Sequence, residues 1–227
     1  MMFHASSECY ATMDIYRMIN GVPCIIGMLL GSMQSYTCTP NVTAKKIADQ
    51  IAGLGYLVVA PDYMNKDPFV DQGNVPITDW LKNHLPISAV PSTRTIVDVL
   101  KQKGISSVGA VGFCWGGKVV VELAKLDILK VAVMCHPSFV SVDDIKEVKI
   151  PIAILAAETD NITPPAMAAQ FQEILGSKKD VKSFVKIYPG TFHGWVNRYD
   201  PSNPVQLGKA EEAHKKIFEW LQTYLHE

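Results

Sequence analysis

The sequence lacks the cysteine patterns that build disulfide frameworks and zinc ribbons. Its five cysteines are an odd number, and no Cys-x-x-Cys pair occurs among them. A disulfide scaffold needs paired cysteines in an oxidising compartment, and a structural zinc site needs closely spaced thiolates. We therefore predict no metal site and a cytoplasmic location. By default, each cysteine in such a protein is a small buried hydrophobe.

Clustered basic charge and a membrane-spanning apolar run are also missing. Lys and Arg total 21 against 22 Asp and Glu, which gives a net charge of -1. Phosphate binding needs clustered basic side chains, so we expect no nucleic-acid partner. A transmembrane helix needs ~20 apolar residues, and the apolar residues 18–30 are interrupted by Gly21, Pro23 and Gly27. The basic start of a secretory signal is missing too, so we expect no membrane partner.

Apolar runs with the length of strands alternate with amphipathic runs with the length of helices over most of the 227 residues. This alternation predicts the α/β class, with a mostly parallel sheet and helices on both faces. We expect one domain over residues 1–227, in which residues 1–43 form an atypical N-terminal region. The predicted strands are 22–30, 56–60, 108–112, 129–134, 150–156 and 184–188. The predicted helices are 44–54, 77–84, 91–103, 115–125, 165–175 and 206–224.

The predicted strands are apolar throughout, which is typical of burial on both faces of a sheet. Ligands of such sheets bind at the carboxyl ends of the strands. Functional side chains should therefore come directly after a strand.

One cysteine, Cys114, follows a strand in a context that favours catalysis. Residues 108–121 read VGAVGFCWGGKVVV, an apolar strand that enters a glycine-rich turn and then a helix. This is the arrangement of the G-x-S-x-G nucleophile elbow with cysteine in place of serine. Gly112 and Gly116 leave room for the tight turn, and the helix N-terminus stabilises a thiolate and an oxyanion. The alternative is a buried cysteine in an ordinary strand–helix turn.

An acid and a base follow later strands, in the chain order nucleophile, acid, base. Asp160 comes after the strand IPIAILA, and His193 comes after the strand around FVKIY. Glu158 is an alternative acid, although it lies nearer the strand. His136 also follows a strand, but it precedes Asp160 and so breaks the expected order. We favour Asp160 and His193, while a turn residue and a surface histidine remain the plain alternatives.

Five ordered motifs resemble the dienelactone hydrolase (carboxymethylenebutenolidase-like) family, and most closely its plant-like branch. They are IADQIAGLGYLVVAPDY at 47–63, VGFCWGGKVVVELAK at 111–125, AVMCHPSF at 132–139, PIAILAAETDNITPP at 151–165 and YPGTFHGWVNRY at 188–199. The resemblance runs from about residue 45 to the C-terminus. It implies the α/β-hydrolase fold, a Cys–His–Asp triad and no cofactor.

The resemblance also implies roles for individual residues. Cys114 would be the nucleophile, His193 the base and Asp160 the residue that orients it. The oxyanion hole would use the backbone N–H of Trp115 and a second donor near Leu29. The family often grips the substrate carboxylate with arginine, which implies that role for Arg198, with Arg94, Lys82 and His84 as weaker candidates and a solvated loop charge as the alternative for Arg198. His136 is a further candidate to line the substrate pocket, because it follows a strand.

One departure from the family lies near the first strand. The family usually has an acidic residue there that controls ionisation of the cysteine, and Met28 stands at the aligned position in this sequence.

Three functions are compatible with these residues. The first is hydrolysis of a small-molecule ester or lactone through an acyl-enzyme. The second is glucan hydrolysis, as labelled for some plant relatives, which needs two opposed carboxylates. The third is a non-catalytic binding protein that has kept the fold. The sequence is compatible with a monomer or a dimer.

Overall fold

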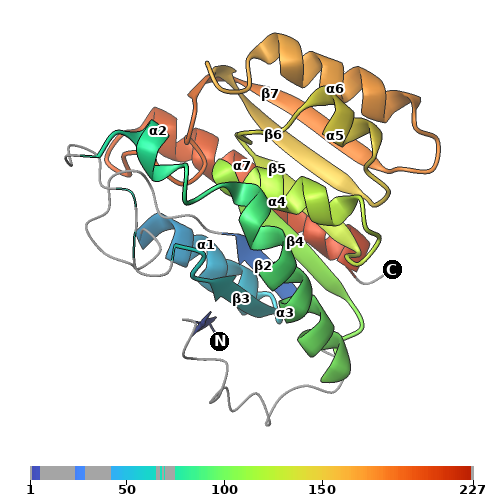
Figure 1. The fold of residues 1–227 in the computed structure, drawn as a ribbon. Helices are drawn as coiled ribbons and strands as arrows, with labels where there is room; N and C mark the ends of the chain where they lie inside the picture. The colour runs from blue at the N-terminus through green and yellow to red at the C-terminus, as the bar shows by residue number, and fades with distance from the viewer. Residues whose placement is uncertain are drawn as a thin grey trace.

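A single sheet of parallel strands forms the centre of the computed structural model, which describes residues 2–5, 24–28, 42–64, 67, 69 and 75–225 (Figure 1). The strands lie in the order β1-β3-β2-β4-β5-β6-β7, and each described pair is parallel. Their bounds are β1 Met2–Ala5, β2 Cys24–Met28, β3 Leu57–Pro61, β4 Val108–Phe113, β5 Val131–Cys135, β6 Ile152–Thr159 and β7 Ser183–Phe192. The predicted α/β class and mostly parallel sheet are confirmed.

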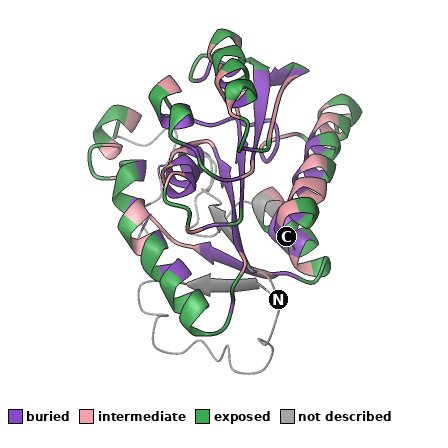
Figure 2. Cartoon of the chain, turned by 90° about the vertical axis from the view of Figure 1, so that its right-hand side faces the viewer, coloured by how far each residue is buried: buried purple, intermediate pink, exposed green. Residues whose placement is uncertain are grey.

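Helices cover both faces of this sheet (Figure 2). Helices α1 (Val42–Gly53) and α7 (Pro204–Leu225) contribute to one hydrophobic core, and α3 (Val90–Gln102), α4 (Trp115–Ala124), α5 (Val142–Lys146) and α6 (Pro165–Ser177) contribute to the other. A short helix α2 (Ile77–Trp80) and a 3-10 turn η3 (Pro86–Ala89) precede α3. Every residue of β4 and β5 is buried, as expected for strands covered on both faces.

The structure differs from the sequence prediction in several elements. Strand β1 lies in the N-terminal region, where no strand was expected, and α5 and η3 were not predicted. Helix α2 ends at Trp80 and is followed by turns, so the predicted helix 77–84 is only half formed. Strand β7 continues beyond the predicted strand 184–188 to Phe192, with an irregular register where it pairs with β6.

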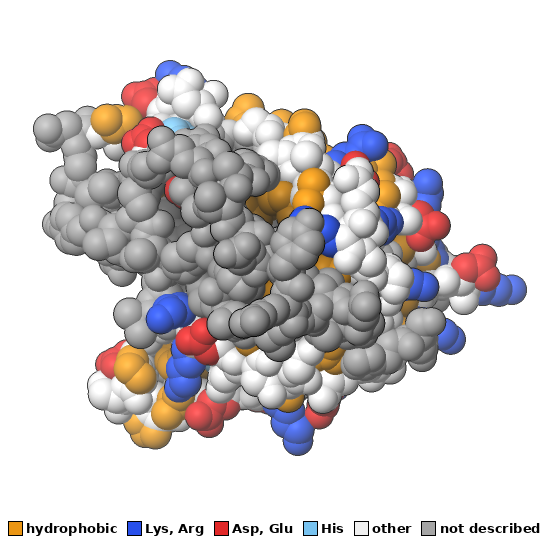
Figure 3. Space-filling view, turned by 90° about the horizontal axis from the view of Figure 1, so that it is seen from below, with side chains coloured by type: hydrophobic (Ala, Val, Ile, Leu, Met, Phe, Trp, Pro, Cys, Tyr) orange, Lys and Arg blue, Asp and Glu red, His pale blue; other side chains and the backbone are white. Residues whose placement is uncertain are grey.

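Charged side chains of both signs are interspersed among the described residues on the face shown in Figure 3. Within the described ranges, every helix is too short or too polar to span a bilayer.

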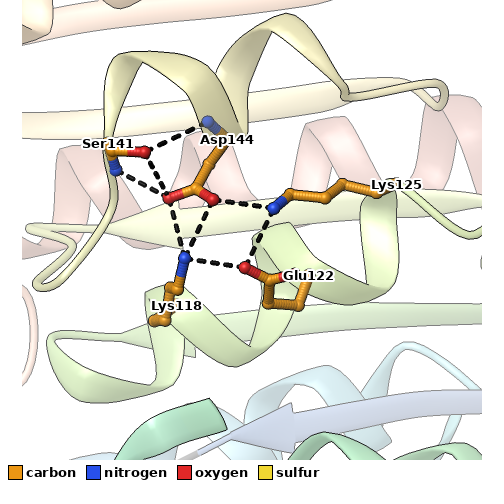
Figure 4. A network of polar contacts seen from close by, with 5 residues as sticks. All are labelled: Lys118, Glu122, Lys125, Ser141 and Asp144. Carbon is orange, nitrogen blue, oxygen red and sulfur yellow. Dashed lines mark hydrogen bonds and ion pairs between the residues drawn. The ribbon is translucent and has the colours of Figure 1, made fainter.

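Helices α4 and α5 are joined by a compact ionic cluster of Lys118, Glu122, Lys125 and Asp144 (Figure 4). Asp144 accepts hydrogen bonds from Lys118 and Lys125 at 2.7–2.8 Å, and it also caps α5 by reciprocal bonds with Ser141. Burial raises the pKa of Asp144, but the two ammonium groups and Ser141 outweigh it and hold that pKa well below its usual value. The cluster fastens the helix that follows Cys114 to the next layer.

Replacing Asp144 with alanine is expected to destabilise the fold by about 3 kcal/mol. Two largely buried ammonium groups lose one of their two carboxylate partners, and α5 loses the half of its capping box that the Asp144 carboxylate supplies. The change in free energy of unfolding is measured by urea denaturation. Asp143→Ala is the matched control, since the Asp143 carboxylate is 83% exposed and pairs with an exposed lysine. We expect less than about 1 kcal/mol for that exposed pair. Equal effects of the two substitutions would contradict the stabilising role of the cluster.

Candidate active site

The turn between β4 and α4 holds Cys114 in a strained backbone conformation. Cys114 has a φ of 52°, a backbone angle that residues other than glycine rarely adopt. A Cβ atom on Gly112 would overlap with the carbonyl group of Gly116, so the glycine is needed for the tight turn. The Cys114 N–H donates to the Cys135 carbonyl at 3.1 Å, which ties the turn to β5. The strand–turn–helix arrangement predicted for residues 108–125 is present.

Two side chains that follow later strands form a continuous hydrogen-bonded chain that ends at the Cys114 sulfur. His193, directly after β7, lies with Nε2 3.1 Å from Sγ, and its Nδ1 lies 2.8 Å from Asp160 Oδ2. Asp160, directly after β6, is 5% exposed, and its Oδ1 accepts the backbone N–H groups of Ile162 and Thr163. These bonds fix the carboxylate, which in turn fixes the imidazole. The three predicted catalytic residues are therefore brought together.

The surroundings favour a thiolate paired with an imidazolium. Burial raises the pKa of Cys114, but His193, a hydrogen bond from Ser138 and the charge of Arg198 together bring it below its ordinary value. Burial lowers the pKa of His193, but Asp160 and Cys114 overcome this and raise it to about 9. The pKa of Asp160 falls below its ordinary value, because its contacts with His193 and backbone N–H groups outweigh burial. Both shifts act in the direction that stabilises a Cys114 thiolate beside a His193 imidazolium.

Alkylation of Cys114 by iodoacetamide is expected to rise with pH around a midpoint below about 8.5, the ordinary thiol value. A second change should follow near pH 9, where His193 loses its proton. The raised pKa of His193 also contributes stability that is complete below pH 6.5 and is lost as the pH rises through about 9. Peptide mass spectrometry of the labelled protein gives the rate at each pH, with Cys114→Ala as the blank. A midpoint at or above that of a free thiol would contradict the ion pair.

Glu158 and His136, the alternative acid and base, have other contacts. Glu158 is exposed, and its carboxylate accepts the Gly190 N–H at 2.9 Å. His136 is 1% exposed and lies edge-on to the His193 ring, with ring centroids 5.0 Å apart. Burial and the nearby charges of His193 and Arg198 hold the pKa of His136 well below its ordinary value, so this imidazole is neutral. His136 therefore packs behind the base, and its role in substrate binding stays a prediction.

The structure gives contacts for three of the predicted substrate and oxyanion residues, Arg198, His84 and Trp115. The Arg198 side chain fills the space beside Gly194, directly after His193, and its charge acts on Cys114. The ring of His84 stacks on Trp80, and its carbonyl accepts the Trp115 indole N–H at 2.6 Å. Helix α4 begins at Trp115, whose backbone N–H is the predicted first oxyanion donor.

Two further predictions concern Leu29 and Met28, in the first predicted strand. Leu29, the predicted second oxyanion donor, lies outside the described residues. Met28 ends β2, where it pairs with Gly112 of β4. The oxyanion and substrate-binding roles of all these residues stay predictions.

Sequence reasoning missed one residue of the site, Ser138. Its hydroxyl lies 3.3 Å from the Cys114 sulfur, and its side chain is buried at 2% exposure. Ser138 follows β5 by three residues, so its place after a strand was the available signal. Nothing about a single serine in a short loop distinguishes it in the sequence.

Comparison with known proteins agrees with this geometry. Residues 38–225 match the model of the dienelactone hydrolase family. The hydrolase pyvD of Aspergillus violaceofuscus is 34% identical over 187 residues, which cover 81% of this chain and 76% of the fungal protein. An endo-1,3;1,4-beta-D-glucanase of Zea mays is 39% identical over 137 residues, which cover 60% of this chain but only 44% of the maize protein.

A crystal structure from Klebsiella pneumoniae, assigned as a dienelactone hydrolase, superimposes with a TM-score of 0.70 at 16% identity and covers 91% of this chain and 90% of its own. That likeness shows the fold, and the family match extends over most of the sequence. The chain therefore belongs to the dienelactone hydrolase family and is a hydrolase with the α/β-hydrolase fold.

Proposed function

We infer that this hydrolase cleaves small esters or lactones through a Cys114–His193–Asp160 triad and an acyl-enzyme. The observation that carries this inference is the unbroken chain from Asp160 Oδ2 to His193 Nδ1 at 2.8 Å and from His193 Nε2 to Cys114 Sγ at 3.1 Å. In a catalytic triad the nucleophile is hydrogen-bonded to its base, and the base is hydrogen-bonded to the group that orients it.

The resting ion pair supplies both partners of the first step. The Cys114 thiolate attacks the carbonyl carbon, and the bond to the leaving oxygen breaks. His193 gives its Nε2 proton to that oxygen, which leaves as an alcohol or, in a lactone, stays tethered to the acyl group. Asp160 stabilises the imidazolium before this transfer and holds the neutral ring afterwards. Amides need stronger protonation of the leaving group, so activated esters and enol-lactones are the favoured class.

The surroundings of the triad favour a substrate with an apolar body and a carboxylate. Three exposed large apolar side chains lie within two residues of Ser138, Asp160 or His193 in the chain, namely Phe139 at 46%, Ile162 at 50% and Phe192 at 42%. Arg198 supplies a cation close enough to lower the pKa of Cys114. A guanidinium forms paired hydrogen bonds with a carboxylate. An unsaturated lactone that carries a carboxylate combines both features.

Glucan hydrolysis is the second possibility, because the maize relative is named a glucanase. It needs two carboxyl groups that flank the scissile bond, one of them free to act as an acid. Both oxygens of Asp160 are engaged, by His193 and by backbone N–H groups, and Glu158 is bonded to the Gly190 N–H. These contacts favour acyl transfer over glycosyl transfer.

A substrate panel tests the proposal. Purified protein is assayed with p-nitrophenyl acetate, a carboxylated enol-lactone and mixed-linkage glucan. We expect turnover of the first two, with a lower KM for the carboxylated substrate that rises in the Arg198→Met variant. Release of reducing sugar that survives Cys114→Ala would favour the glucanase instead. No turnover of any ester, together with alkylation of Cys114 no faster than that of a free thiol, would favour a non-catalytic binding protein.

A further inference from the structure

The sulfur of Cys114 has a second polar neighbour besides the imidazole. Ser138 Oγ lies 3.3 Å from Sγ, and the 2% exposure of Ser138 largely excludes water from this side chain. We propose that Ser138 is a catalytic residue that donates a hydrogen bond to the Cys114 thiolate and thereby helps it leave the acyl-enzyme. The second part of this proposal rests on the proposed function.

The loop after β5 is built to hold this hydroxyl in place. The Ser138 N–H donates to the Cys114 carbonyl at 2.9 Å, so the two residues are joined through the backbone as well as through their side chains. The preceding Pro137 carbonyl accepts the buried Thr163 hydroxyl at 2.7 Å. A Cβ atom on Gly117 would come within 2.7 Å of the Pro137 ring, so α4 and the loop pack in direct contact.

The backbone on either side of Ser138 is strained in the same sense as at Cys114. His136 has a φ of 36° and Phe139 a φ of 61°, both in the left-handed region although neither is glycine. Such conformations persist only where the surrounding contacts hold them, and they concentrate at functional sites. The strain and the two backbone anchors together indicate a position that is fixed for the sulfur.

The direction of the hydrogen bond follows from the ionisation of Cys114. A thiolate carries no proton, so in the resting ion pair Ser138 donates and the sulfur accepts. A hydrogen bond to an ionised acceptor is considerably stronger than one to a neutral acceptor. In the thioester of the acyl-enzyme the sulfur is neutral and accepts only weakly. The bond therefore strengthens as negative charge returns to the sulfur.

That change in strength assigns Ser138 to the second half of the reaction. Water attacks the thioester carbonyl and gives a proton to neutral His193, the carbon–sulfur bond breaks, and its electron pair goes to Sγ. The products are a carboxylic acid, the Cys114 thiolate and the His193 imidazolium, which restores the resting pair. Only an interaction that is stronger in the transition state speeds a step. In acylation the same bond weakens, because negative charge leaves the sulfur as it attacks. The hydrogen bond therefore does not speed acylation, since a stabilised thiolate is a poorer nucleophile.

Ser138→Ala tests the proposal through two measurements that a merely structural role would not separate. The first is the pH midpoint of Cys114 alkylation by iodoacetamide. We expect it to rise by about one unit, so that alkylation on the rising limb falls about tenfold. The second is stopped-flow hydrolysis of p-nitrophenyl acetate. We expect the burst at high pH to be retained, while the steady rate after it falls about tenfold because the thiolate leaves more slowly.

Thr93→Val is the matched control, since it removes a buried hydroxyl of helix α3 whose hydrogen bonds join it to Ala89 and Tyr63 and not to the sulfur or the Ser138 loop. It is expected to leave the alkylation midpoint in place. Ser138→Gly repeats the test if the alanine variant does not fold, and Ser138→Thr should restore the wild-type midpoint.

An unchanged midpoint in Ser138→Ala, or burst and steady rates that fall by the same factor, would overturn the proposal. The alkylation measurement needs no turnover. An inactive wild-type protein would therefore count against the proposed function, while the midpoint would still test the hydrogen bond.

Discussion

Cys114→Ala is expected to reduce ester hydrolysis by about 10³- to 10⁶-fold, which is the range seen when a nucleophile is removed from a triad. The alanine variant keeps the elbow backbone and loses only the sulfur that lies 3.1 Å from His193 Nε2. Hydrolysis of p-nitrophenyl acetate measures the loss, and circular dichroism checks that the variant folds.

Cys135→Ala is the matched control for this substitution. Cys135 ends β5 and is fully buried, and burial raises the pKa of its thiol, so it is a packing residue. Its alanine variant should retain most of the activity at some cost in stability. Undiminished hydrolysis by Cys114→Ala would exclude this cysteine as the nucleophile.

Asp160→Asn should lower kcat by about 10³- to 10⁴-fold with little change in the fold. An asparagine can present its NH₂ group to His193 Nδ1, which then becomes an acceptor, and the ring holds its proton on the wrong nitrogen. The variant also loses the charge that raises the pKa of His193. Steady-state kinetics over a range of pH measures both effects. The change in rate that accompanies loss of the His193 proton should move to lower pH.

Glu158→Gln is the matched control, because this carboxylate lies two residues before Asp160 and is exposed. Its hydrogen bond with the Gly190 N–H is one that an amide oxygen can also accept. We expect activity close to that of the wild type. A large loss in Glu158→Gln with a small one in Asp160→Asn would mean that the acid has been assigned to the wrong residue.

The triad could be predicted because its residues follow strands that are neighbours in both the chain and the sheet. Strands β4, β5, β6 and β7 lie side by side in that order. Residues that directly follow them therefore meet at one edge of the sheet, and Cys114, Asp160 and His193 are such residues. The expected chain order then separated His193 from His136, and the structure shows His193 at the sulfur and His136 behind it.

What the sequence did not reveal depends on backbone conformation in short segments. Ser138 reaches the sulfur because the loop has positive φ angles on both sides of it, and no residue type there signals this, since neither His136 nor Phe139 is glycine. Strand β7 extends through Pro189, a residue that usually ends a strand, because an irregular register with β6 accommodates it. Helix α5 has only five residues, too few for a recognisable apolar period, and its cap and ionic cluster stabilise it.

Mass spectrometry of the protein quenched during turnover tests the central claim most directly. With p-nitrophenyl acetate as substrate, we predict one acetyl group per chain, on the peptide that contains Cys114. The adduct should form far more slowly in His193→Ala and be absent from Cys114→Ala. Continued hydrolysis with no acetyl group on Cys114, or with the group on another residue, would contradict the account.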